Sequence, residues 1–382
     1  MKISELLDSI EKRDLVLPEF QREYVWSIEQ SKELISSLIK DFPVGSLLFW
    51  KTDNPPELKN VDLLPEKLGT VKVILDGQQR LTTLFLLLRG KVPPYYRQED
   101  ITNDPRDLFF NLSTRELQYY QQLKMKDNPL WVKVTDVFGS SEINVFQIAN
   151  RLNGGSDESF RLAEQFNTNL NSLRNVEKVD LPTQTVPPHA TLEDAITIFD
   201  LVNSQGTKLT EAELALTHVT GKWSKARRDI KGKADELSKA HYYFDLTFMT
   251  RALTGVVCRR ALYETIHHRG KDELQDGWST LDSILDYLVS ILPTYAFIHS
   301  THDLSTTNAL VPIIVYLSLN ERKFPNNHEL KQAIHWLYAA QIWARYTAQT
   351  DQRLEQDVSI VVREKSPWLM LCIQIIDQRG RL

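Results

Sequence analysis

The hydrophobic positions of the first ninety residues alternate between a helical spacing and short apolar runs. Apolar residues from Leu34 to Ile39 recur on one helical face, and Ser27 with Gln30 forms a capping box before them. The runs 44–50 and 71–75 are short, apolar and bounded by Gly or Pro, which predicts two strands. Helices therefore alternate with strands here.

A buried helix is predicted from Arg80 to Arg89, because the segment is almost wholly apolar and Gly90 follows as a C-terminal cap. Residues 109–120 predict a small hairpin, and the Pro- and Thr-rich stretch 181–189 predicts an extended connection.

Helical patterns return after this connection. Thr191 opens one predicted helix, and Thr210 with Glu213 forms a capping box before the next. Beyond Lys222 the pattern is mostly amphipathic helix. We therefore expect an α+β fold whose core comprises residues 1–90 and 190–220, with an insertion over 91–189 and an α-helical domain over 221–382.

Composition narrows the class of protein. The chain has 382 residues, of which 42% are hydrophobic and 25% charged, as in ordinary globular proteins. Its net charge of −5 argues against a protein that coats nucleic acid broadly, so any such contact must come from a local patch. The spacing of Cys258 and Cys372 indicates neither a disulfide framework nor a zinc site. The apolar run Ala309–Leu319 is shorter than the roughly 20 residues of a membrane span. We expect a soluble cytoplasmic protein without membrane contact.

The segment from Asp76 to Arg80 is the strongest candidate for chemistry. It stands where a strand passes into a helix, whose first N–H groups lack partners and favour an anion. Gly77 permits close approach of a phosphate, Gln78 and Gln79 offer amide donors, and Arg80 offers a fork of donors. The alternative is a plain turn that Asp76 caps.

Three other segments carry weaker signals. The stretch Pro18–Trp26 alternates polar and aromatic residues and is either core or one wall of a pocket. Residues 203–207 form a polar turn that either joins two helices or contacts a ligand. The basic run from Lys222 to Lys233 is either a solvated face or the best polyanion patch of the chain.

These segments together resemble the N-terminal domain of GmrSD-type, modification-dependent restriction enzymes. The family motifs stand here as Leu17 to Trp26, Pro43 to Ser46, Asp76 to Arg80, and Asn203 to Leu209. A stretch at Lys124 to Trp131 also looks familial. The resemblance implies a core similar to the ParB/sulfiredoxin fold with a nucleotide pocket.

By this resemblance the pocket binds and hydrolyses a nucleoside triphosphate with Mg²⁺ or another divalent cation. It implies catalytic roles for Asp76, Gln79 and Arg80, with Asp76 also as the metal ligand. The nucleotide-binding set that it implies is Gln21, Arg22, Tyr24, Gly45, Ser46, Gly77, Gln78, Thr82, Thr83, Asn203 and Gly206. The candidate DNA-binding residues are Lys222, Lys225, Arg227 and Arg228.

The leading hypothesis is therefore the nucleotide-hydrolysing regulatory part of an anti-phage restriction system that recognises modified or phage DNA. Many relatives continue into a nuclease of the His-Asn-His kind, and none of the nine histidines here has that context. We expect the nuclease in a separate domain or subunit. The sequence is compatible with a homodimer. The alternatives are a DNA- or partner-binding module that does not hydrolyse nucleotide, and a toxin-like nuclease.

Overall fold

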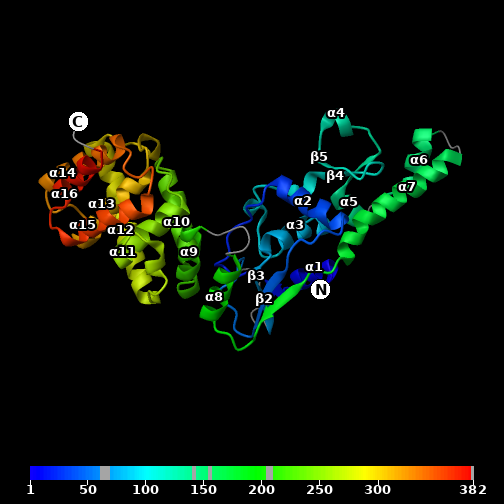
Figure 1. The fold of residues 1–382 in the computed structure, drawn as a ribbon, viewed down its shortest axis with the longest axis horizontal. Helices are drawn as coiled ribbons and strands as arrows, with labels where there is room; N and C mark the ends of the chain where they lie inside the picture. Colours follow the sequence, from blue (N-terminus) through cyan, green and yellow to red (C-terminus); the bar gives the residue numbers. More distant parts are fainter. Residues whose placement is uncertain (61–68, 140–142, 154–156, 204–209, 380–382) are drawn as a thin grey trace. The chain divides into compact units, whose positions relative to one another are not determined.

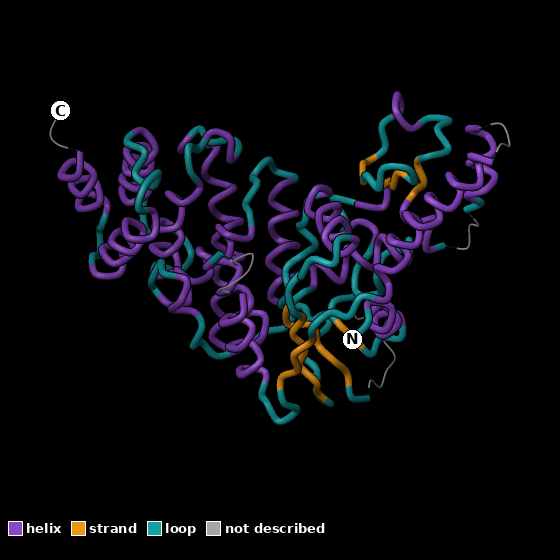
Figure 2. Tube along the Cα trace, turned by 45° about the vertical axis from the view of Figure 1, so that its right-hand side comes forward, coloured by secondary structure: helices purple, strands orange, loops and turns teal. Residues whose placement is uncertain are grey.

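A computed structural model describes residues 1–60, 69–139, 143–153, 157–203 and 210–379 (Figure 1). The chain divides into two compact units, Met1–Val202 and Asn203–Leu382. Among the described residues every strand lies in the first unit, and the second contains helices and loops (Figure 2). The expected order, a mixed α/β region followed by a mostly helical one, is confirmed.

The main sheet of the first unit joins segments that are far apart in the sequence. Its strands, in spatial order, are β1 (Leu15–Val16), β3 (Val71–Asp76), β2 (Leu47–Thr52) and β7 (Thr183–Val186). β2 runs antiparallel to β3, whereas β1 is parallel to β3 and β7 is parallel to β2. The extended stretch 181–189 thus supplies an edge strand of this sheet.

Three helices build the core beside this sheet: α1 (Ile3–Glu11), α2 (Ile28–Ile39) and α3 (Gln78–Arg89). The predicted capping box of α2 is confirmed, since the Gln30 N–H donates to the Ser27 hydroxyl at 3.2 Å and the Ser27 N–H donates to Gln30 Oε1 at 2.9 Å. Gly90 ends α3 in the left-handed conformation, with φ 67°, as predicted. Local signals therefore set the ends of these helices.

The chain between β3 and β7 forms a second, three-stranded sheet and a helical hairpin. The sheet has the order β5-β4-β6, and α6 packs along α7, which extends away from the main sheet (Figure 1). The elements are η2 (Gln98–Asp100), η3 (Pro105–Asp107), β4 (Leu108–Asn111), β5 (Leu117–Tyr119), α4 (Gln122–Met125), β6 (Trp131–Lys133), α5 (Val134–Phe138), α6 (Val145–Asn153), α7 (Asp157–Arg174) and η4 (Asn175–Lys178). The predicted hairpin is confirmed as β4 and β5.

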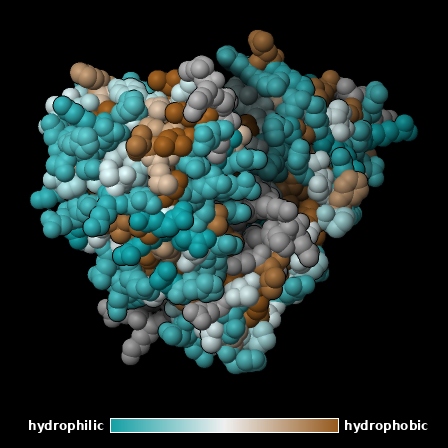
Figure 3. All heavy atoms as spheres, turned by 60° about the vertical axis from the view of Figure 1, so that its left-hand side comes forward, coloured by the Kyte–Doolittle hydropathy of each residue, from teal (hydrophilic) through white to brown (hydrophobic). Residues whose placement is uncertain are grey.

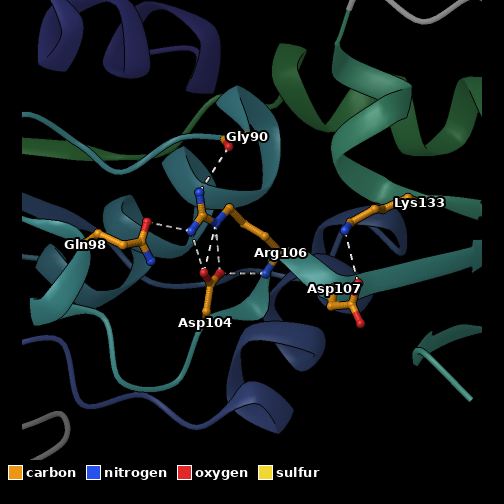
Figure 4. Close-up of polar contacts among 6 residues, drawn as sticks. All are labelled: Gly90, Gln98, Asp104, Arg106, Asp107 and Lys133. Carbon is orange, nitrogen blue, oxygen red and sulfur yellow. Dashed lines mark hydrogen bonds and ion pairs between the residues drawn. The ribbon is translucent and has the colours of Figure 1, made fainter.

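Arg106 fastens this second sheet to the end of α3 (Figure 4). Its guanidinium donates to both carboxylate oxygens of Asp104, to Gln98 Oε1 at 2.8 Å and to the Gly90 carbonyl at 3.3 Å. Burial alone raises the pKa of Asp104, but the hydrogen bonds from Arg106 outweigh it and leave the pKa below its usual range. The carboxylate therefore stays charged where β4 begins.

The remaining helices begin with α8, which crosses the boundary between the units. They are α8 (Leu192–Asn203), α9 (Glu211–Lys222), α10 (Ala226–Ser238), α11 (Leu246–Cys258), η5 (Tyr263–Ile266), α12 (Lys271–Ala296), η6 (Thr301–Asp303), η7 (Thr307–Ala309), α13 (Leu310–Leu319), α14 (Asn327–Ile342), α15 (Thr350–Arg363) and α16 (Trp368–Arg379). The sequence places residues 190–220 with the first core, whereas α9 packs against α10, α11 and η5. Its buried alanines and leucine belong to the core of the second unit.

Two buried carboxylates lock the helices of the second unit. Asp357 accepts from Arg345 Nε at 2.9 Å, from Arg345 Nη2 at 2.6 Å and from the Tyr346 hydroxyl at 2.5 Å, and its side chain is 0% exposed. Glu329 accepts from the Tyr316 hydroxyl at 3.0 Å and from Trp368 Nε1 at 2.9 Å, which ties α16 to α13 and α14. Charge-assisted hydrogen bonds thus offset the cost of burying each carboxylate.

The exposed side chains agree with the ordinary globular composition of the chain. The face drawn in Figure 3 is mainly hydrophilic, with scattered hydrophobic residues. Across the part of the chain that the structure describes, every helix is too short or too polar to cross a bilayer.

We predict that Asp357→Asn lowers the free energy of unfolding by about 3–5 kcal/mol, because it leaves the buried Arg345 without its counter-ion. Urea unfolding of the full chain measures this. The matched control is Asp235→Asn on the exposed side of α10, expected to change stability by less than about 0.5 kcal/mol. Equal stabilities of the two variants would contradict the role of the buried pair.

Candidate functional site

Gln21 holds the segment 18–26 against the end of β3. Its Nε2 donates to the Leu75 carbonyl at 2.8 Å and to the Ile74 carbonyl at 3.3 Å. The residue is only 4% exposed, so both bonds form out of water. Gln21 therefore joins two of the predicted motifs as part of the scaffold.

Gln79, at the start of α3, binds the same segment from the other side. Its Oε1 accepts the N–H groups of Val25 at 2.9 Å and of Trp26 at 3.2 Å, while its Nε2 donates to the Glu23 carbonyl at 2.9 Å. Both ends of one side-chain amide are thus satisfied by backbone groups of a single loop. We call this arrangement the Gln79 clamp.

Gln78 makes a third connection to this loop. Its Nε2 donates to the Arg22 carbonyl at 2.6 Å and contacts the Tyr96 hydroxyl, which itself donates to the same carbonyl at 3.2 Å. The structure therefore places the predicted residues Gln21, Gln78 and Gln79 together, with their amides directed at backbone groups.

The predicted hydroxyl donors are buried beside tyrosines. The Tyr24 hydroxyl lies 2.9 Å from the Ser31 hydroxyl and 2.9 Å from the Thr83 hydroxyl, and Thr82 lies 3.3 Å from the Tyr95 hydroxyl. Burial raises the pKa of Tyr24, so its phenol remains protonated and available for these bonds. Both threonines are 0% exposed and face the core.

Arg80 fastens the loop before β2 to the start of α3. Its Nη1 donates to the Val44 carbonyl at 2.6 Å, and its Nη2 donates to the Ser46 carbonyl at 2.8 Å and to Asp76 Oδ2 at 2.9 Å. Burial lowers the pKa of Arg80, and the nearby Asp76 carboxylate opposes that effect. These contacts use three of the five N–H donors of the guanidinium.

Two glycines allow this close packing. Gly77 has φ 92°, and a Cβ there would lie 2.1 Å from Leu47 Cδ2. Gly45 has φ 86°, and a Cβ there would lie 2.7 Å from Arg80 Nη1. Any side chain at either position would therefore clash and strain the backbone.

The N-terminus of α3 has no side-chain cap. Gly77, and not Asp76, is the N-cap residue, and it offers no side chain to the first N–H groups. The carboxylate of Asp76 instead pairs with Arg80 and is partly exposed, at 30%. The interpretation of Asp76 as a helix cap is therefore wrong, and the start of α3 keeps N–H groups that favour an anion.

A buried lysine that the sequence did not indicate lies beside this cluster. Lys59 is 6% exposed, and its Nζ lies 2.9 Å from Glu23 Oε1 and 5.8 Å from the centre of the Tyr96 ring. The segment around it reads as a Pro-rich loop without periodicity, so no sequence signal marks Lys59. Among the described residues, no cluster of three or more His, Cys, Asp or Glu side chains could hold a metal ion.

The basic run is only partly available to a polyanion. Arg227 is buried at 6% exposure, and Lys222 Nζ donates to the His267 carbonyl at 2.9 Å. Lys225, which precedes α10, and Arg228 and Lys231 on α10 are exposed at three-residue spacing. Helical periodicity thus divides the run, because α10 turns Arg227 toward the core.

Three predicted residues, Asn203, Gly206 and Ser46, remain. Asn203 is the last residue of α8, and Gly206 lies outside the described residues. Ser46 contributes its carbonyl to Arg80, as described above.

The fold and site define an α+β domain in which three polar motifs meet at one strand-to-helix turn, followed by a helical unit. The model of the GmrSD restriction endonuclease N-terminal domain matches residues 3–220, and the chain belongs to this family. It is also 21% identical, over 407 aligned residues, to the uncharacterized protein MJ0686 of Methanocaldococcus jannaschii. That alignment covers 95% of this chain and 67% of the relative.

We predict that Gln79→Met lowers the free energy of unfolding by at least about 2 kcal/mol, because it leaves the N–H and carbonyl groups of the 23–26 loop without partners. Thermal and urea unfolding measure this. Gln147→Met on α6, an exposed helical glutamine, is the matched control and is expected to have little effect. An unchanged stability for Gln79→Met would mean that the clamp contributes nothing.

Proposed function

We propose that this chain binds and hydrolyses a nucleoside triphosphate as the regulatory part of a restriction system that recognises modified or phage DNA. The observation that carries the proposal is the uncapped start of α3, flanked by Arg80 and by Gly45 and Gly77 in left-handed conformations. Membership of the GmrSD family supports the restriction role.

The phosphates would lie against the first turn of α3. Its N–H groups and the positive end of the helix dipole attract an anion. Arg80 has donors beyond its three contacts, and Arg22 precedes the clamped loop in a half-buried position. Both guanidiniums can bind phosphate oxygens by paired hydrogen bonds.

Asp76 is the residue that would hold a divalent cation. Its carboxylate is a hard oxygen ligand, it is partly exposed, and Arg80 fixes its orientation through Oδ2. A single protein carboxylate fits Mg²⁺, which keeps most of its waters and binds phosphates as further ligands. When bound, the ion would neutralise charge on the phosphate oxygens.

The three glutamines act in this proposal as positioning residues. The family resemblance implies a catalytic role for Gln79 and nucleotide binding by Gln21 and Gln78, yet their amides bind backbone groups of the motif itself. Their contribution is to hold Arg22 beside α3. Reaction chemistry is left to Asp76 and Arg80, and DNA cleavage to a nuclease domain or subunit outside this sequence.

The exposed cations at the start of α10 and on its first turns favour a second candidate function. Lys225, Arg228 and Lys231 form a basic row that suits a DNA- or partner-binding module without nucleotide hydrolysis. Such a module would bind duplex DNA with an affinity that falls steeply with salt and would show no turnover.

The test measures Mg²⁺-dependent hydrolysis of each nucleoside triphosphate by the full chain. We expect Asp76→Asn and Arg80→Lys to lower kcat/KM by about a hundredfold or more, because each removes a preorganised charge contact at the phosphates. Arg106→Lys, which alters an equivalent fork elsewhere in the first unit, is the matched control and should retain activity.

Thermal unfolding of each variant separates lost chemistry from lost folding. Activity unchanged in folded Asp76→Asn and Arg80→Lys would overturn the assigned roles. A wild-type chain that neither binds nor hydrolyses any nucleotide, yet binds DNA in a salt-dependent way, would establish the second candidate.

A further inference from the structure

We propose a second anion site, for a phosphate-bearing ligand, at the start of β3. A cavity of about 330 Å³ opens there beside α1, and its lining includes Lys51, Lys72, Ser9 and Thr70. Lys72 lies four residues before Asp76 on β3, which is about 13 Å at the rise of a strand. This site is therefore separate from the turn of the proposed function and does not depend on it.

The two lysines face each other directly across the sheet. Lys51 of β2 and Lys72 of β3 are register partners in an antiparallel ladder, so their side chains project from the same face. The neighbouring pair on that face, Phe49 and Ile74, lies in the core with Leu15. Both ammonium groups thus stand at the margin of the core face, where the cavity opens.

This pairing of like charges is unfavourable by itself, because directly opposed cations repel. Among the described residues, neither Lys51 nor Lys72 forms an ion pair, and Lys72 Nζ has only the Met1 sulfur, at 3.9 Å. Asp14 also lines the cavity, but its bond to Lys72 is between backbone groups, at 2.8 Å. A bound dianion would convert the repulsion into two attractive contacts.

The surrounding groups favour phosphate over a metal or an apolar ligand. Met1 also lines the cavity, and its ammonium donates to the Leu181 carbonyl at 3.1 Å and pairs with Asp180 at 3.6 Å. The Ser9 hydroxyl donates to the Glu5 carbonyl at 2.8 Å, and the Thr70 hydroxyl donates to Asp53. The two lysine ammonium groups therefore supply the donors, a pattern suited to a compact multivalent oxyanion.

The test compares thermal unfolding of the full chain in sodium phosphate and in sodium chloride of equal ionic strength. We expect phosphate to raise the Tm of the wild type above its value in chloride. Lys51→Thr and Lys72→Thr should each weaken phosphate binding at this cavity about tenfold or more, so that phosphate raises the Tm of each variant clearly less than that of the wild type. The increment that remains comes from the general stabilisation by an excluded salt and from the start of α3. In chloride alone, Lys51→Thr should be at least as stable as the wild type, since the repulsion is removed.

Two controls make the result specific. Lys126→Thr removes an exposed lysine at the end of α4 and should keep the full phosphate increment, as should Lys51→Arg, which retains the charge. The proposal fails if phosphate and chloride stabilise the wild type equally, or if both Lys51→Thr and Lys72→Thr keep the full increment of the wild type.

Binding of a labelled DNA duplex distinguishes the two sources of phosphate. A backbone phosphate as the ligand predicts weaker duplex binding by Lys51→Thr and competition by inorganic phosphate. A free phosphate compound as the ligand predicts unchanged duplex binding with the same reduction of the phosphate increment. Either result supports the site.

Discussion

The Gln79 clamp is the interaction on which the arrangement of the first unit depends. One buried amide satisfies two N–H groups and one carbonyl of a loop more than fifty residues earlier in the chain. Buried polar groups destabilise the fold when they are unpaired. Once α3 has formed, the loop is therefore held in the position that pairs its backbone groups with Gln79. The Gln21 amide binds a backbone carbonyl at the end of β3 in a similar way. Gln21 and Gln79 together fix the segment 18–26 on two sides.

This scaffold divides the polar motif residues into two groups. The glutamines bind backbone groups, whereas Asp76 and Arg80 pair with each other at the uncapped end of α3. Left-handed glycines permit the approach of Leu47 and of the Arg80 guanidinium. The residues best placed to act on an anion are thus the two charged ones, held in place by neutral amides that bind backbone groups of the motif.

The second unit is stabilised by buried carboxylates. Asp357 of α15 accepts from Arg345 and Tyr346 in the turn after α14. Glu329 of α14 accepts from Tyr316 of α13 and Trp368 of α16. The family match ends at residue 220, inside α9, although α9 packs in the core of the second unit. The family domain therefore includes the first helix of the helical unit, and the compact units do not coincide with the limits of the match.

The sequence by itself determined the features that depend on neighbours along the chain. The capping boxes at Ser27 and Thr210, the cap at Gly90 and the strand-to-helix turn at Gly77 are local, because each involves backbone groups within a few residues. The motif pattern also brought the Gln21 segment and the Gln79 turn together. Only the tertiary structure decided which groups their side chains bind, since the amides meet carbonyls and N–H groups that any residue carries. It likewise decided the burial of Arg227, the pairing of Lys59 with Glu23 and the opposition of Lys51 and Lys72, because packing and strand register are long-range properties.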